Sequence, residues 1–255
     1  MRRLPQRLGH GESLATVEHL EELRSRLIVA GGAVIAGSIV GYVVHRRVLR
    51  LLIDALPAQH RKLTTFGIAE PFTTSLKLSV VIGLLLALPV VLWQVWAFLA
   101  PALDAAAQRA MSGFVALAGG LLVVGVAFGD RVALPAALRF LTTYDTSVYN
   151  VQIRAADYIS FAILVLAACG IVFELPIAVL GLVRVRALSS AKLRRNRRIG
   201  YLIVCAIGVA LPGVDPVTTT IETIPLLLLF EASIWMAVVF ERRWFAPATI
   251  APSPG

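Results

Sequence analysis

The sequence HLEELRSRLIVAGGAVIAGSIVGYVV, residues 19–44, joins a charged helical turn directly to a long apolar run. The apolar part, 27–44, is about long enough for a helix that crosses a hydrocarbon core of about 30 Å. Gly37 and Gly41 lie four residues apart in this run and would offer a smooth face to an approaching helix. The polar residues ahead of the run lack a small-residue cleavage site, so we expect the first helix to be retained.

The composition agrees with a membrane protein. Of 255 residues, 58% are apolar and 15% are charged, whereas soluble domains carry about 25% charged residues. The net charge of +9 could indicate nucleic-acid binding, but the basic residues lie in loops between apolar runs, as topology signals do. Cys169 and Cys205 lie inside apolar runs without metal-ligand spacing, so we expect no metal, cofactor or disulfide.

Five further apolar runs follow the first. They cover residues 76–99, 111–128, 158–183, 199–211 and 218–240. The run 199–211 would form only roughly 20 Å of helix, and a tight turn at Pro212-Gly213 separates it from the last run. The sequence therefore predicts an all-α integral membrane protein with six transmembrane helices, the last two short.

Two of the connections are long. Residues 46–72 and 134–157 each contain an amphipathic segment, at 48–56 and 134–141 respectively, which we expect to lie along the membrane interface. The first of these connections ends in Glu70-Pro71-Phe72, which is expected to form a turn.

Orientation follows from the basic residues. The N-terminal tail, the second and fourth connections and the C-terminal tail hold 15 of the 24 Lys and Arg residues, against 8 on the opposite side. Because the side richer in basic residues faces the cytoplasm, both termini are expected there. The predicted organisation is a cytoplasmic tail with an amphipathic helix at 1–26, a membrane bundle at 27–240 and a cytoplasmic tail at 241–255.

The charged turn that opens the first helix is the main soluble polar surface. Leu20 and Leu23 fall on one side, which is expected to dock on protein, and the carboxylate of Glu22 falls toward the other. An ion pair between Glu22 and Arg26, four residues apart, would explain this acid without any binding function.

Enzyme motifs are absent from the sequence. The histidines lie outside the apolar runs or at their edges, at His10, His19, His45 and His60. No HExxH, P-loop or GxGxxG occurs, so the chain is predicted not to be an enzyme.

The informative residues are acids within the apolar runs. Glu174 lies roughly 15 Å along a helix from the basic connection that begins at Arg184, where an ionised carboxylate costs several kcal/mol unless it is paired or protonated. It could contact a partner, or it could be bonded for packing alone. Glu231 is a weaker case of the same kind, and Glu222 is expected to be solvated near the outer surface.

Several short motifs occur in a fixed order along residues 14–241. They are HLEELRSRL at 19–27, EPF at 70–72 followed by Lys77, LP at 88–89 with QVWAFLAPAL at 94–103, FELP at 173–176, PGVDP at 212–216 and FE at 230–231. In order and in placement on six spans, they resemble the TatC family, the multispan subunit of the twin-arginine (Tat) protein translocase.

The resemblance implies binding of twin-arginine signal peptides and outward transport of folded proteins driven by the proton gradient. It also implies single-span partner subunits of the TatA and TatB type, a homo-oligomer within a translocase complex, and the plasma membrane of a prokaryote. Glu22 matches the family's signal-binding acid, and the surrounding pattern is matched by Leu20, Arg24, Phe98 and Pro101. Glu174 matches the acid where partner helices dock. Three other motif residues are expected to have a role that is either structural or functional, namely Glu70, Asp215 and Glu231.

The sequence departs from the family pattern in the connection after the second run. Ala107 and Gln108 stand where a second signal-binding Glu is usual, and Asp104 is the only acid there. We therefore expect Asp104 to supply the second carboxylate, or to cap the helix that follows it. The alternative function is a proton-coupled secondary transporter of a small solute, with Glu174 and Glu231 as its site.

Overall fold

The computed structural model describes residues 10–99, 105–145, 148, 152–184, 186–210 and 216–244. The side chains of 10–19, 99, 105–111, 243 and 244 are outside this description. Helices make up the fold, and the described residues contain no strand beyond one isolated bridge between Thr64 and Arg154.

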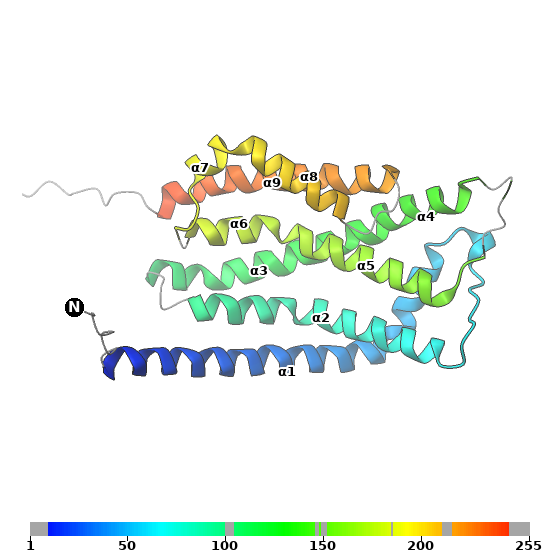
Figure 1. Cartoon of the computed structure of the whole chain (residues 1–255), viewed down its shortest axis with the longest axis horizontal. Coiled ribbons are helices and arrows are strands. Elements are labelled where there is room, and N and C mark those ends of the chain that lie inside the picture. The colour runs from blue at the N-terminus through cyan, green and yellow to red at the C-terminus, as the bar shows by residue number, and fades with distance from the viewer. Residues whose placement is uncertain are drawn as a thin grey trace, which may run out of the picture.

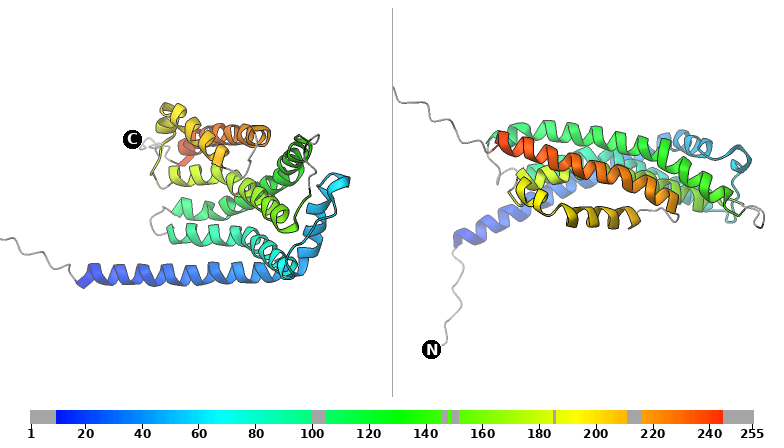
Figure 2. Two further views of the ribbon diagram at one scale, coloured as in Figure 1. Left: turned by 45° about the vertical axis from the view of Figure 1, so that its right-hand side comes forward. Right: turned by 90° about the horizontal axis from the view of Figure 1, so that it is seen from above.

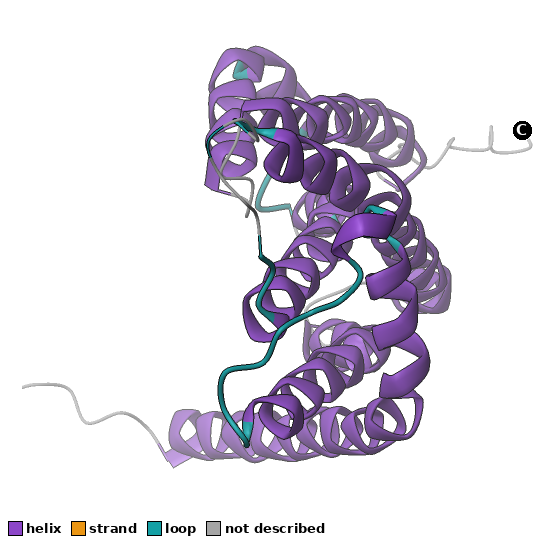
Figure 3. Ribbon diagram, turned by 90° about the vertical axis from the view of Figure 1, so that its right-hand side faces the viewer, coloured by secondary structure: helices purple, strands orange, loops and turns teal. Residues whose placement is uncertain are grey.

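The helices follow one another in a bundle of long, nearly parallel rods (Figure 1). In chain order they are α1 (His10–Asp54), the 3-10 helix η1 (Ala58–His60), α2 (Glu70–Leu99), α3 (Ala105–Phe128), the π-helix η3 (Gly129–Ala133), α4 (Leu134–Thr143), α5 (Ala155–Phe173), α6 (Leu175–Arg184), α7 (Ser190–Arg195), α8 (Arg197–Ala210) and α9 (Pro216–Trp244). Figure 3 looks along the rods and shows them as a curved wall.

Five segments are long and apolar enough to cross a membrane. They are Leu20–Asp54, Glu70–Phe98, Ser112–Thr143, Ala155–Arg184 and Pro216–Arg242. These segments confirm an all-helical membrane protein. The fifth predicted span, 199–211, corresponds to α8, which has 14 residues and is shorter than these five segments.

The close crossing of α1 and α2 confirms the predicted use of Gly37 and Gly41. A Cβ at Gly37 would lie 2.6 Å from the carbonyl oxygen of Gly83, and one at Gly41 would lie 2.4 Å from that of Ser79. Backbone therefore meets backbone, and only glycine allows the two helices to approach this closely.

The prediction of a loop at 46–72 was wrong at both of its ends. The first helix continues to Asp54, because Leu52 and Leu56 are 1% exposed within a core formed with α5, so protein rather than lipid covers this amphipathic segment. At the other end, Glu70 and Pro71 are the first residues of α2 and do not form a turn. Proline suits a first helical turn because the N–H that it lacks has no helical partner there.

The predicted loop at 134–157 was also wrong in its first part. The third helix passes through the π-helix Gly129–Ala133 into α4, whose buried residues Leu134 and Leu138 belong to the same core. An amphipathic segment that packs on protein in this way continues the span instead of lying along the membrane interface.

Two further boundaries differ from the expectation. The predicted span 158–183 is divided at Glu174 into α5 and α6, with Pro176 in the first turn of α6. The last helix, α9, has 29 residues and is not short, because it starts at Pro216 and extends through the charged residues after 240.

Candidate functional site

Glu22 lies on the N-terminal part of α1, which extends away from the rest of the bundle (Figure 2). Its carboxylate oxygen Oε1 accepts a hydrogen bond of 3.0 Å from Nε of Arg26 and a second one from Nη2 of the same guanidinium. The predicted ion pair between Glu22 and Arg26 is therefore present. Both side chains are partly exposed, at 33% for Glu22 and 25% for Arg26, so the carboxylate holds a guanidinium at the surface of the chain.

The apolar side of this turn is exposed in the chain. Leu20 is 59% exposed and Leu23 is 45% exposed. Among the other helices, α2 makes nearly all of the contacts with α1. Leu20 therefore offers an apolar surface next to Glu22. Arg24 is exposed and lines the same stretch of surface as Glu21.

The helix crossing fixes which part of α2 lies beside Glu22. Gly37 faces Gly83 and Gly41 faces Ser79, so α1 and α2 run antiparallel with residue numbers that add up to 120. Continued along the two helices, this register sets Glu22 level with Phe98 at the C-terminal end of α2. The structure thus places two of the predicted site residues at one end of the bundle. Pro101, Asp104 and Asp215 lie outside the described residues.

Glu174 lies at the break between α5 and α6 and lines a hollow of about 350 Å³. Both carboxylate oxygens are buried and have no hydrogen-bond partner within the described part of the chain. Trp96 of α2 forms one wall, where its indole packs on Gly181. The rim includes the exposed side chains of Val95 and Leu182, so the hollow opens at the surface. A buried acid without a partner is costly, and a polar group that entered the hollow would relieve this cost.

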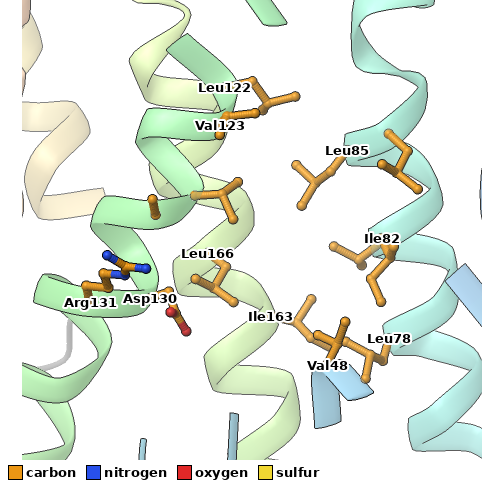
Figure 4. Close-up of a pocket in the computed structure, with 14 residues that line it drawn as sticks. Val48, Leu78, Ile82, Leu85, Leu122, Val123, Asp130, Arg131, Ile163 and Leu166 are labelled. Carbon is orange, nitrogen blue, oxygen red and sulfur yellow. The ribbon is translucent and has the colours of Figure 1, made fainter. Parts of the chain in front are cut away.

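A second hollow lies between α2 and α3 with α5 as its floor (Figure 4). It has a volume of about 440 Å³, and its walls are apolar side chains such as Ile82, Leu122 and Leu166. Asp130 and Arg131 of the π-helix lie at one end. No feature of the sequence indicated this hollow, because its three walls come from separate apolar runs.

Glu70 has a structural role that the sequence left open. It accepts hydrogen bonds of 3.1 Å from Nε and from Nη2 of Arg154, and further ones from the backbone N–H groups of Phe66, Gly67 and Ala156. The Glu70 carboxylate also raises the pKa of the Arg154 guanidinium. This acid therefore ties the segment before α2 to the start of α5.

Glu231 is likewise bonded. Its Oε2 accepts a hydrogen bond of 2.8 Å from Nη2 of Arg197, and its Oε1 accepts one from the hydroxyl of Tyr201, both on α8. The acid thus joins α8 to α9, and it does not lie free for a transported proton. Glu222 is only 3% exposed, so the expectation that it is solvated was wrong. The arginines that bind Glu70 and Glu231 lie 84 and 34 residues away along the chain, beyond the reach of any local sequence signal.

Comparison with known proteins gives consistent matches. The family described as Sec-independent protein translocase protein (TatC) matches residues 18–225. A TatC of Carboxydothermus hydrogenoformans is 34% identical over 230 residues, which are 90% of this chain and 95% of that protein. A TatC of Aquifex aeolicus is 33% identical over 233 residues, with 89% and 95% of the two chains covered.

Two crystal structures of the twin-arginine translocase receptor TatC have the same fold. One superposes with a TM-score of 0.74 at 31% identity and covers 87% of this chain and 98% of the other. The second, in DDM, has a TM-score of 0.76 at 31% identity and covers 86% and 99%.

Proposed function

Because this chain belongs to the TatC family of Sec-independent protein translocase subunits, we propose that it recognises twin-arginine signal peptides through Glu22. The observation that carries the proposal is the Glu22 carboxylate, which binds the guanidinium of Arg26 at an accessible end of α1. A peptide arginine offers the same planar donor group, so it can replace Arg26 without new chemistry. Lysine lacks this planar fork.

Two adjacent arginines carry two charges, and one carboxylate neutralises only one of them. Asp104 is proposed as the second acid, because it follows the C-terminal end of α2, where Phe98 lies level with Glu22. Leu20 and Phe98 would contact the apolar parts of the bound peptide. Arg24 and Pro101 would shape the site.

The proposed topology has six spans with α8 as the short fifth, and both termini in the cytoplasm of a prokaryotic cell. The asymmetry of Lys and Arg supports this orientation. It places Glu22 on the cytoplasmic side and the Glu70 to Arg154 contact on the outer side. The tail 1–26, the bundle 27–240 and the tail 241–255 remain the proposed organisation.

Glu174 is proposed as the contact for a single-span partner subunit of the TatA or TatB type. Its hollow is apolar except for this acid. A partner helix that carried a polar side chain could fill the hollow and bond the carboxylate. Assembly into a homo-oligomeric translocase that uses the proton gradient belongs to the same proposal.

The test is the affinity of the purified protein for a labelled twin-arginine peptide. Glu22→Gln should weaken binding by about tenfold or more, since a hydrogen bond to a charged group contributes about 1.5–3 kcal/mol. The matched control is Glu21→Gln, which removes the same charge one position away and should bind normally. A peptide with two lysines should bind the wild type poorly. Equal affinities of the two variants would refute the assignment of Glu22.

A further inference from the structure

A third hollow, here called the α6–α8 groove, lies between α6, α7, α8 and α9. Its apolar walls include Leu182, Ile199, Ile203 and Phe230. Its volume is about 370 Å³. Ile199 and Ile203 are 57% and 56% exposed, so one side of the groove is open along α8.

Polar groups of this groove occur only at the α7 end. Lys192 of α7 and Asn196, which follows it, line that end. They offer an ammonium and an amide N–H₂, both donors to an anion. The groove is therefore an apolar channel with a donor pair at one mouth.

The region around this mouth is strongly positive. Residues 184–198 contain seven of the 24 basic residues. Arg197 is paired with Glu231, but within the described residues no ion pair involves Lys192, Arg194, Arg195 or Arg198. The side chains of these four residues are exposed. The start of α7 carries one carboxylate, that of Glu241, which accepts a hydrogen bond from the N–H of Ser190. An anion at the mouth would therefore meet a net positive charge.

The size of the groove favours one occupant. A helix about 10 Å wide that rises 1.5 Å per residue fills on the order of 120 Å³ per residue, so the groove would take only about three residues of it. A narrow hydrocarbon chain fits lengthwise. In addition, the 14 residues of α8 span roughly 21 Å, less than the hydrocarbon thickness of about 30 Å, which brings headgroups near its ends.

We propose that the α6–α8 groove binds an anionic phospholipid of the leaflet at this end of the bundle. One acyl chain lies against Ile199 and Ile203, and the phosphate accepts hydrogen bonds from Lys192 and Asn196. Each basic residue near a lipid surface contributes about 1 kcal/mol of attraction for an anionic lipid, which corresponds to about fivefold in affinity. This site is separate from Glu22, and it shares only Leu182 with the lining of the Glu174 hollow.

Native mass spectrometry of the full-length protein tests the site with phosphatidylglycerol and phosphatidylcholine. The wild type should retain phosphatidylglycerol preferentially. Lys192→Gln should weaken phosphatidylglycerol binding about fivefold and phosphatidylcholine binding less, because the choline cation offsets the charge of the same phosphate. Arg194→Gln is the matched control, because it removes one charge from the same helix without lining the groove, and its effect should be smaller. Ile203→Trp should fill the groove and weaken both lipids.

Several outcomes would overturn the proposal. Equal retention of the two lipids would remove the role of charge, and equal losses in Lys192→Gln and Arg194→Gln would indicate only diffuse attraction. Displacement by glycerol phosphate alone would indicate a site for soluble phosphate. A protein dimer that Ile203→Trp abolishes would assign the groove to a second copy of the chain. Ile203→Gln, with a similar size but a polar side chain, should also weaken both lipids, and if both Ile203 variants retain them normally the groove is not the site.

Discussion

Gly41→Ala should separate α1 from α2. The added Cβ would lie 2.4 Å from the carbonyl oxygen of Ser79, whereas ordinary contacts begin at 3.4 Å, so the helices must part by about 1 Å. The obstacle is backbone within a helix and cannot rotate away as a side chain would. Overpacking of this kind destabilises proteins by about 1–3 kcal/mol. For a chain of this size we expect a melting temperature lower by roughly 2–12 °C.

The displacement should also reach the signal-binding end. Glu22 is roughly 28 Å along α1 from Gly41, and the register of the crossing sets it level with Phe98. A shift of about 1 Å exceeds the tolerance of a hydrogen bond, so twin-arginine peptide affinity should fall together with stability.

The assay is thermal unfolding in detergent, followed by peptide binding at a temperature where every variant is folded. Gly31→Ala is the matched control, because a Cβ there meets nothing within 4 Å. It should melt at or above the wild-type temperature, since alanine favours a helix over glycine. If Gly41→Ala and Gly31→Ala have the same melting temperature, the backbone contact between α1 and α2 is not what holds these helices together.

Three further predictions concern acids. Asp104→Asn can still cap the following helix but loses its charge, so peptide affinity should fall at least about tenfold; unchanged affinity would leave Glu22 as the only carboxylate of the site. Glu174→Ala should fold but lose export, whereas Glu174→Gln should keep part of it by retaining a hydrogen-bonding group; full export by the alanine variant would exclude a functional contact. Glu70→Gln should lower the melting temperature more than Arg154→Lys does, because the first change leaves a guanidinium without its carboxylate while the second keeps an ion pair. The opposite order would contradict the structural role of the contact between Glu70 and Arg154.

The sequence by itself determined that the chain is helical and embedded in a membrane. Apolar runs of the right length need no knowledge of their neighbours, because the bilayer imposes the length directly. The spacing of Gly37 and Gly41 likewise predicted a close helix contact. The ordered motifs, from the segment around Glu22 to the one around Glu231, were sufficient to identify the family.

Only the tertiary structure decided what covers each apolar face. The segments 48–56 and 134–141 have the pattern of interfacial helices, yet Leu52 and Leu134 are buried by protein. Lipid tails and the protein interior are equally apolar, so the pattern of apolar residues in a segment cannot show whether lipid or protein covers its apolar face.

The tertiary structure also decided which acids are bonded. Glu70, Glu174 and Glu231 look alike in the sequence as carboxylates in or beside apolar runs. The first is held by Arg154 and the third by Arg197 and Tyr201, while the second has no partner among the described residues. These differences arise from contacts between distant parts of the chain, and such contacts exist only once the helices have packed.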